Sequence, residues 1–191
     1  MLRPAMIASA LALTLGSPAL AQHSPAPMAS MAADPGVSPL TGVSATDYVK
    51  LAADADMYEI QSSRLALTRS KRDDVKNYAR EMISDHSLTT KSLMAALKNK
   101  DRTIAAPSTR LSSENAAKIE LLKKAPRASF DDLYLQQQAQ AHQAAWALHK
   151  GYATDGTDPA LKQIASAAVP VVERHLGHSK QLLPAGLSPA R

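Results

Sequence analysis

Apolar residues recur every three or four positions through most of the chain after residue 44, which is the spacing of one face of an α-helix. No segment shows the strict alternation of a β-strand. Ser44, Ser129 and Asp158 stand where helix N-caps are expected, and Pro159 suits a first helical turn. The pattern predicts an all-α fold with four long helices and a short one, at about 45–69, 74–99, 113–124, 129–152 and 159–182.

The order of these helices predicts how they pack. Two helical hairpins, joined by a longer connection that holds the short helix 113–124, are expected to form a four-helix bundle over residues 45–183. Residues 22–44 are rich in Pro, Ala, Ser and Met without periodicity, so we expect a disordered linker there. Residues 184–191 would form a C-terminal tail. Pro170 should distort the last helix locally.

The first 21 residues have the features of a secretory signal peptide. A basic start at Arg3 is followed by a short apolar run that ends in Ala19-Leu20-Ala21. The run is shorter than the roughly 20 apolar residues needed to span a bilayer, and no later stretch approaches that length. We therefore expect a cleaved leader, residues 1–21, and a mature chain without a transmembrane segment in the periplasm or outside the cell. An uncleaved signal anchor is the alternative.

Composition removes several classes of function. The chain has no cysteine, which excludes disulfides, thiolate nucleophiles, cysteine-bound zinc and iron–sulfur clusters. Its formal net charge of +5 is spread along the chain without a basic stripe and interleaved aromatic residues. This pattern predicts no nucleic-acid partner. The sequence is compatible with either of two partners, an envelope protein or a second copy of the chain.

Each predicted long helix carries a polar residue on its apolar face: Glu59, His86, His142 and His175. Counting from the hairpin turns at about 1.5 Å per residue places the first three within about 3 Å of one level. The same counting places His175 about 10 Å away, a gap that unequal loops or Pro170 could partly close.

Three interpretations of these residues remain open. Imidazole and carboxylate groups on facing helices suit a divalent transition metal such as zinc, iron, manganese or copper. Alternatively, they form a buried polar layer in which His86 hydrogen-bonds to Glu59, since unpaired polar groups are costly to bury. An apolar groove for a ligand or peptide is the third. The adjoining Asp85 and Glu173 should point away from the apolar face, and His149 and His178 should be exposed or half-exposed.

Catalysis has little support in the sequence. Oxygen-activating di-iron bundles carry a Glu three residues before a ligand His on two helices. Here Ile83, Ala139 and Val172 occupy those positions. There is also no Gly-rich phosphate loop and no strand–turn–helix elbow for a nucleophilic serine. The sequence therefore predicts no catalytic residue.

Four stretches resemble a known family in their order and motifs: "YEIQSSRLAL", "VKNYAREMISDHSLTTKSL", "SFDDLYLQQQAQAHQAAWAL" and "DPALKQIASAAVPVVERHL". They resemble the bacterial domain-of-unknown-function 4142 family over roughly 45–182. The family's Glu falls on Glu59, its first Asp-His on Asp85-His86, its second on Ala141-His142, and its Pro and His-Leu on Pro170 and His175-Leu176. The second aspartate is thus missing here. The resemblance implies a ferritin-like four-helix fold and export, and it supplies no reaction.

Together these observations favour an exported bacterial envelope protein that is a structural, stress-related or weakly metal-binding helical bundle rather than an enzyme. The alternative is a metal-dependent redox or metal-storage protein of ferritin-like type. The low number of inward-facing carboxylates favours the first interpretation.

The leader generates a direct prediction. The exported protein should begin at Gln22, because Ala19 and Ala21 are the small residues that a signal peptidase reads. Intact-mass spectrometry of the exported protein checks this. A retained Met1 would indicate an uncleaved anchor.

Overall fold

The computed structural model describes residues 35–98, 103–185 and 187. The predicted leader, residues 1–21, lies outside the described residues, as do residues 22–34 of the predicted linker and most of the predicted tail. These parts of the domain division therefore remain predictions.

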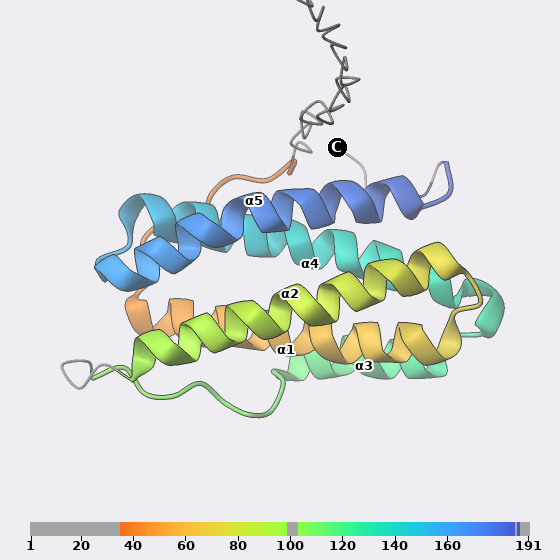
Figure 1. Ribbon diagram of the computed structural model, residues 1–191, viewed down its shortest axis with the longest axis horizontal. Coiled ribbons are helices and arrows are strands. Elements are labelled where there is room, and N and C mark those ends of the chain that lie inside the picture. Colours follow the sequence, from red (N-terminus) through yellow and green to blue (C-terminus); the bar gives the residue numbers. More distant parts are fainter. Residues whose placement is uncertain (1–34, 99–102, 186, 188–191) are drawn as a thin grey trace, which may run out of the picture. The chain divides into compact units, whose positions relative to one another are not determined.

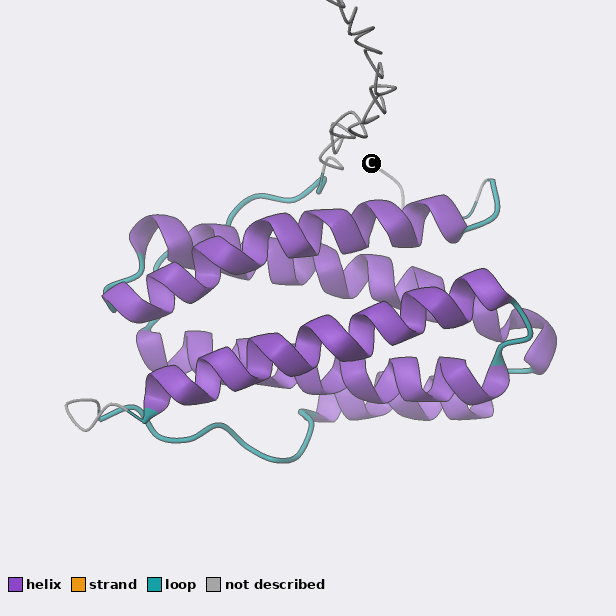
Figure 2. Ribbon diagram, viewed as in Figure 1, coloured by secondary structure: helices purple, strands orange, loops and turns teal. Residues whose placement is uncertain are grey.

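The described residues form five α-helices and no β-strand, which confirms the all-α prediction (Figures 1 and 2). None of these helices combines the length and the apolar character needed to cross a membrane. The short helix lies where the sequence predicts it, and the long helices begin and end within a few residues of their predicted bounds. The helices are α1 (Ala45–Arg69), α2 (Asp73–Leu97), α3 (Ser113–Lys124), α4 (Arg127–Asp155) and α5 (Pro159–Leu182).

Two of the predicted N-caps are present. The Ser44 hydroxyl accepts a hydrogen bond from the Asp47 N–H at 3.1 Å, and the Asp158 carboxylate accepts two from the first turn of α5. The predicted cap at Ser129 is wrong, because α4 begins earlier, with Pro126 as its N-cap. The Pro126 carbonyl accepts the Ser129 N–H at 3.1 Å, so Ser129 already lies inside the first turn.

The four long helices pack so that each contacts two others: α1 contacts α2 and α4, and α5 contacts the same two (Figure 1). The short α3 lies against α1 and α4. The core contains two apolar clusters, one around Tyr78, Phe130 and Tyr134 and one around Tyr48 and Tyr152. On every long helix, the polar residues singled out by the sequence lie between the positions that enter these clusters.

The end of the predicted linker packs along α4, a contact the sequence does not predict. The Leu40 N–H donates to the Ala147 carbonyl at 2.8 Å, and the Gly42 N–H donates to the Asp155 carboxylate at 2.7 Å. Gly151 allows this approach, because a Cβ at that position would lie 1.8 Å from the Leu40 carbonyl oxygen. The position of Leu40 on α4 therefore depends on the missing side chain of Gly151.

This contact generates a prediction for Gly151→Ala. Alanine normally stabilises a helix interior by about 1 kcal/mol relative to glycine. Here the clash with Leu40 should outweigh that gain and lower the free energy of unfolding by about 1–3 kcal/mol. Urea unfolding measures the change, and the neighbouring exposed substitution Lys150→Ala is the control, expected within about 0.5 kcal/mol of wild type. A Gly151→Ala protein more stable than wild type would contradict the close approach.

Candidate metal centre

Three histidines from three helices meet between the two apolar clusters. His86 of α2, His142 of α4 and His175 of α5 each place one possible ligand atom within 4.8 Å of the others. Their exposed fractions are 6%, 0% and 0%, so the group is buried. The predicted gap of about 10 Å to His175 is wrong. The ring centroids of His142 and His175 lie 5.2 Å apart. The continuation of α4 to Asp155, beyond its predicted end at 152, accounts for about 4.5 Å of the predicted gap.

One nitrogen of each ring is held by a hydrogen bond from the periphery. His86 Nδ1 lies 2.8 Å from Asp56 Oδ1, and His142 Nδ1 lies 2.7 Å from the Gln138 carbonyl oxygen. His175 Nε2 lies 3.0 Å from Asp85 Oδ2. Each of these nitrogens donates its proton to an oxygen, so in a neutral ring the other nitrogen carries a free lone pair.

Those other nitrogens are His86 Nε2, His142 Nε2 and His175 Nδ1. All three are buried and have no hydrogen-bond partner among the described residues. A ring that donates one N–H to a carboxylate or backbone carbonyl and keeps its other nitrogen free is the arrangement typical of metal-binding histidine. The three rings together could therefore supply three nitrogen ligands to one ion.

Asp56 is the hydrogen-bond partner of His86, which the sequence pattern did not predict. Its buried carboxylate also accepts hydrogen bonds from the Thr89 hydroxyl at 3.1 Å and the Thr90 hydroxyl at 2.9 Å. The predicted pair between His86 and Glu59 is therefore wrong. The available signal was that Asp56 precedes Glu59 by three positions, so both lie on the same side of α1.

Glu59 is buried near His86, with 2% of its surface exposed. It does not belong to the group whose ligand atoms lie within 4.8 Å of one another. Its Oε2 has no hydrogen-bond partner among the described residues. Burial raises the pKa of Glu59 to about 7, against the opposing effects of His86 and of a hydrogen bond from Gln138. Glu59 is thus a carboxylate that a nearby cation would stabilise.

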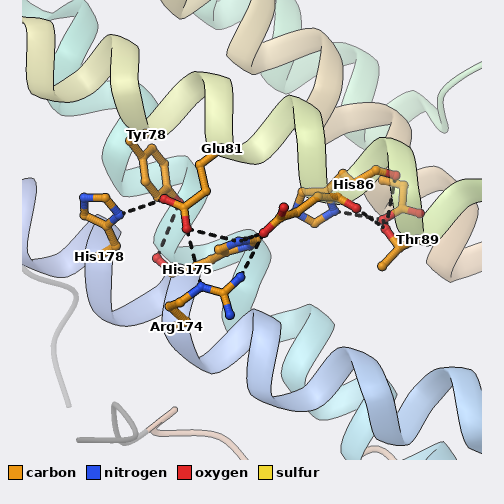
Figure 3. A network of polar contacts seen from close by, with 9 residues as sticks. Tyr78, Glu81, His86, Thr89, Arg174, His175 and His178 are labelled. Atoms are coloured by element: carbon orange, nitrogen blue, oxygen red, sulfur yellow. Dashed lines mark hydrogen bonds and ion pairs between the residues drawn. The ribbon is translucent and has the colours of Figure 1, made fainter. Parts of the chain in front are cut away.

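Asp85 joins the centre to a polar network with Glu81, Arg174 and His178, and Figure 3 shows these three residues around His175. Besides His175, Asp85 binds Arg174, whose Nη2 lies 2.9 Å from Asp85 Oδ2. Glu81 contacts Arg174 as well and lies 3.1 Å from His178 Nδ1. The sequence pattern placed Asp85 off the apolar face of α2, but Asp85 hydrogen-bonds to His175 of α5 and so takes part in the site.

The remaining polar residues have other roles. Glu173 accepts a hydrogen bond from the Trp146 indole N–H at 2.9 Å. His178 is partly exposed, as predicted. The predicted exposure of His149 is wrong: its ring is buried against Tyr48, whose hydroxyl lies 3.1 Å from His149 Nδ1. The aromatic cluster of Tyr48 and Tyr152 covers this part of α4, which the apolar pattern alone does not show.

Burial sets the charge of the three histidines. It lowers the pKa of His142 to about 3 and that of His175 to about 2, with nearby His86 adding to both shifts. Burial also acts against a charged His86, but the hydrogen bond to Asp56 and the charge of Glu59 raise the pKa of His86 above its ordinary value. His142 and His175 are therefore neutral at pH 7 and can donate lone pairs to an ion, whereas an ion that binds His86 Nε2 would displace a proton from it.

Comparison with known proteins adds a family and nothing more specific. A family model described as "Domain of unknown function (DUF4142)" matches residues 26–182. No curated protein and no solved structure gives a significant match to the chain.

The buried histidines generate a prediction for the metal-free protein in chelator. His142, His149 and His175 have lowered pKa values when folded, about 3, 4 and 2, against about 6.5 when unfolded. From pH 6.5 down to pH 5 the unfolded chain therefore binds more protons at these rings, and stability should fall as the pH falls. Glu59 and His86, whose pKa values are raised in the folded protein, bind protons more readily when folded and offset part of this difference. The net loss should be roughly 1–2 kcal/mol per pH unit.

Urea unfolding at pH 6.5, 5.7 and 5.0 measures this dependence. The His149→Leu variant should show a shallower dependence, by about one proton, because it lacks one of the three rings. Stability that does not change over this range, or an equal dependence in the variant, would contradict the buried neutral histidines.

Proposed function

Because the chain belongs to the DUF4142 family, whose description names no activity, we propose its function from the site itself: the protein binds one transition-metal ion through His86, His142 and His175. The ligand atoms would be His86 Nε2, His142 Nε2 and His175 Nδ1. Glu59 would supply a neighbouring negative charge and an oxygen for a further position.

Two observations carry this proposal: the three rings place possible ligand atoms within 4.8 Å of one another, and each ring has one buried nitrogen without a hydrogen-bond partner among the described residues. A buried polar atom without a partner costs about 1–3 kcal/mol. In a purely structural layer the polar groups would pair with one another across the core. Here each ring instead hydrogen-bonds through one nitrogen to an oxygen of Asp56, Gln138 or Asp85. Its other nitrogen has no hydrogen-bond partner among the described residues. A metal ion would satisfy all three nitrogens at once.

The donor set selects the kind of ion. Imidazole nitrogens suit zinc, copper, nickel and iron, whereas magnesium and calcium require mostly oxygen ligands. Nitrogens bonded to one tetrahedral ion lie roughly 3.3 Å apart, given zinc–nitrogen bonds of about 2.0–2.1 Å. The present spacing, within 4.8 Å, would close to that value by small rotations of the side chains. A single ion fits the group.

The carboxylates favour metal binding over ferritin-like oxygen chemistry or storage. Di-iron bundles use several carboxylates as ligands. In this chain Asp56 and Asp85 are engaged by His86 and His175, and Glu59 is the carboxylate left beside the rings. We therefore favour a binding protein over a redox enzyme or a metal store.

The proposal also includes the type of fold and the compartment of the protein. The mutual packing of α1, α2, α4 and α5 supports a four-helix bundle of ferritin-like type, with α3 as an extra helix in the connection between α2 and α4. The predicted leader supports export to the periplasm or beyond. In that compartment the centre would hold a metal ion in the bacterial envelope.

The proposal predicts that metal stabilises the folded protein. A free Zn²⁺ or Co²⁺ concentration a hundredfold above the dissociation constant adds about 2.7 kcal/mol of stability. For a domain of this size the Tm should then rise by roughly 5–10 °C. The His142→Leu variant should lose the rise, because it removes one ligand. Thermal unfolding with and without metal measures the response.

His149→Leu is the matched control. It removes another buried histidine from α4, outside the proposed ligand set, and should keep the metal-dependent rise in Tm. Comparing each variant with and without metal cancels any change in its own stability. A wild-type Tm indifferent to zinc, cobalt, copper, nickel, iron and manganese would refute the centre. So would a His142→Leu protein that responds like wild type.

A further inference from the structure

The buried histidines need a route by which an ion could reach them from solvent. A groove of about 590 Å³ lies between α2 and α5, lined mostly by small and apolar side chains. Asp85 is the first residue of α2 along this lining, and Arg174 is the last residue of α5. These two residues therefore lie at the same end of the groove, and that end is where His175 meets Asp85.

His175 belongs to two groups of possible ligands. One is the buried group with His86 and His142, and the other consists of Glu81, Asp85 and His175, again with ligand atoms within 4.8 Å of one another. The Glu81 and Asp85 side chains are 30% exposed, whereas that of His175 is fully buried. The His175 ring thus separates two carboxylates that reach solvent from nitrogens that do not. Its Nε2 faces Asp85, and its unpartnered Nδ1 is free for the inner group.

The positively charged Arg174 side chain lies between the carboxylates of Glu81 and Asp85. Figure 3 shows Arg174 beside Glu81. Its guanidinium lies 3.4 Å from Glu81 Oε1 and 2.9 Å from Asp85 Oδ2, and half of its side chain is exposed. Ion pairs this accessible to water contribute about 0–1 kcal/mol. A divalent ion, with twice the charge, could displace Arg174 without disturbing the helices.

We infer that Glu81 and Asp85 form the entrance through which a divalent transition-metal ion reaches the three histidines, with Arg174 as the displaceable cation that covers it. The inference rests on the proposed metal centre. An arriving ion exchanges with Arg174 between the two carboxylates and then passes beside the His175 ring to the inner nitrogens. Asp85 Oδ2 lies 3.0 Å from His175 Nε2 and orients that ring, whereas Glu81 Oε1 lies 3.8 Å from it, beyond hydrogen-bond distance. Glu81 is therefore the residue to test.

Stopped-flow absorbance of Co²⁺ binding to the full chain tests this entrance. In Glu81→Gln the association and dissociation rate constants should both fall about tenfold, because one route serves entry and exit. The dissociation constant should stay within about twofold of wild type. Arg174→Gln should bind several-fold faster, since the covering cation is gone. Glu120→Gln, an exposed change on α3 that alters net charge equally, should match wild type.

The outcomes separate the two proposals. Equal association rates in Glu81→Gln and Glu120→Gln would overturn the entrance while leaving the centre intact. A Glu81→Gln protein with a faster dissociation rate and weaker affinity would make Glu81 a ligand, which also overturns the entrance. A wild-type protein that takes up no Co²⁺ at equilibrium would refute the metal centre itself.

Discussion

The hydrogen bonds at the periphery of the three histidines are the constraint on which the rest of the site depends. The Asp56 and Asp85 carboxylates and the Gln138 carbonyl each accept a hydrogen bond from one ring nitrogen. They thereby fix which nitrogen of each ring remains a lone-pair donor, as well as the direction in which it points. Without these partners the rings could rotate or change tautomer, and the three nitrogens proposed as ligands would no longer be held in place.

This arrangement needs a rigid frame, which the apolar clusters on both sides provide. Five tyrosines are fully buried along the core, and their rings pack against the same helices that carry the histidines. Close packing leaves little freedom for a helix to slide, so the relative heights of the four polar positions are fixed. The unpartnered nitrogens lower the free energy of unfolding, and the close-packed core cannot rearrange to pair them. Such a site stays ready for an ion instead of closing on itself.

The sequence predicted the elements of this structure better than their connections. The three-and-four spacing placed Glu59, His86, His142 and His175 on inward faces correctly, because a helix repeats every 3.6 residues whatever it packs against. It could not give the height of His175, which depends partly on where α4 ends and α5 begins. Nor could it give the partner of His86, which depends on how α1 is rotated against α2. The exposure of His149 was predicted wrongly because the ring of Tyr48, on the neighbouring helix α1, packs against it. These are properties of pairs of helices, and the pattern of one helix does not contain them.

The central claim is that one metal ion lies among His86, His142 and His175. Anomalous diffraction from crystals of the untagged protein, grown with Co²⁺ or Zn²⁺ and measured at the absorption edge of that metal, tests it most directly. The account predicts one strong anomalous peak at bonding distance, about 2.0–2.2 Å, from His86 Nε2, His142 Nε2 and His175 Nδ1. The hydrogen bonds to Asp56, Gln138 and Asp85 should remain in place. An anomalous map with no peak among the three rings, with their nitrogens hydrogen-bonded to water or to one another, would contradict it.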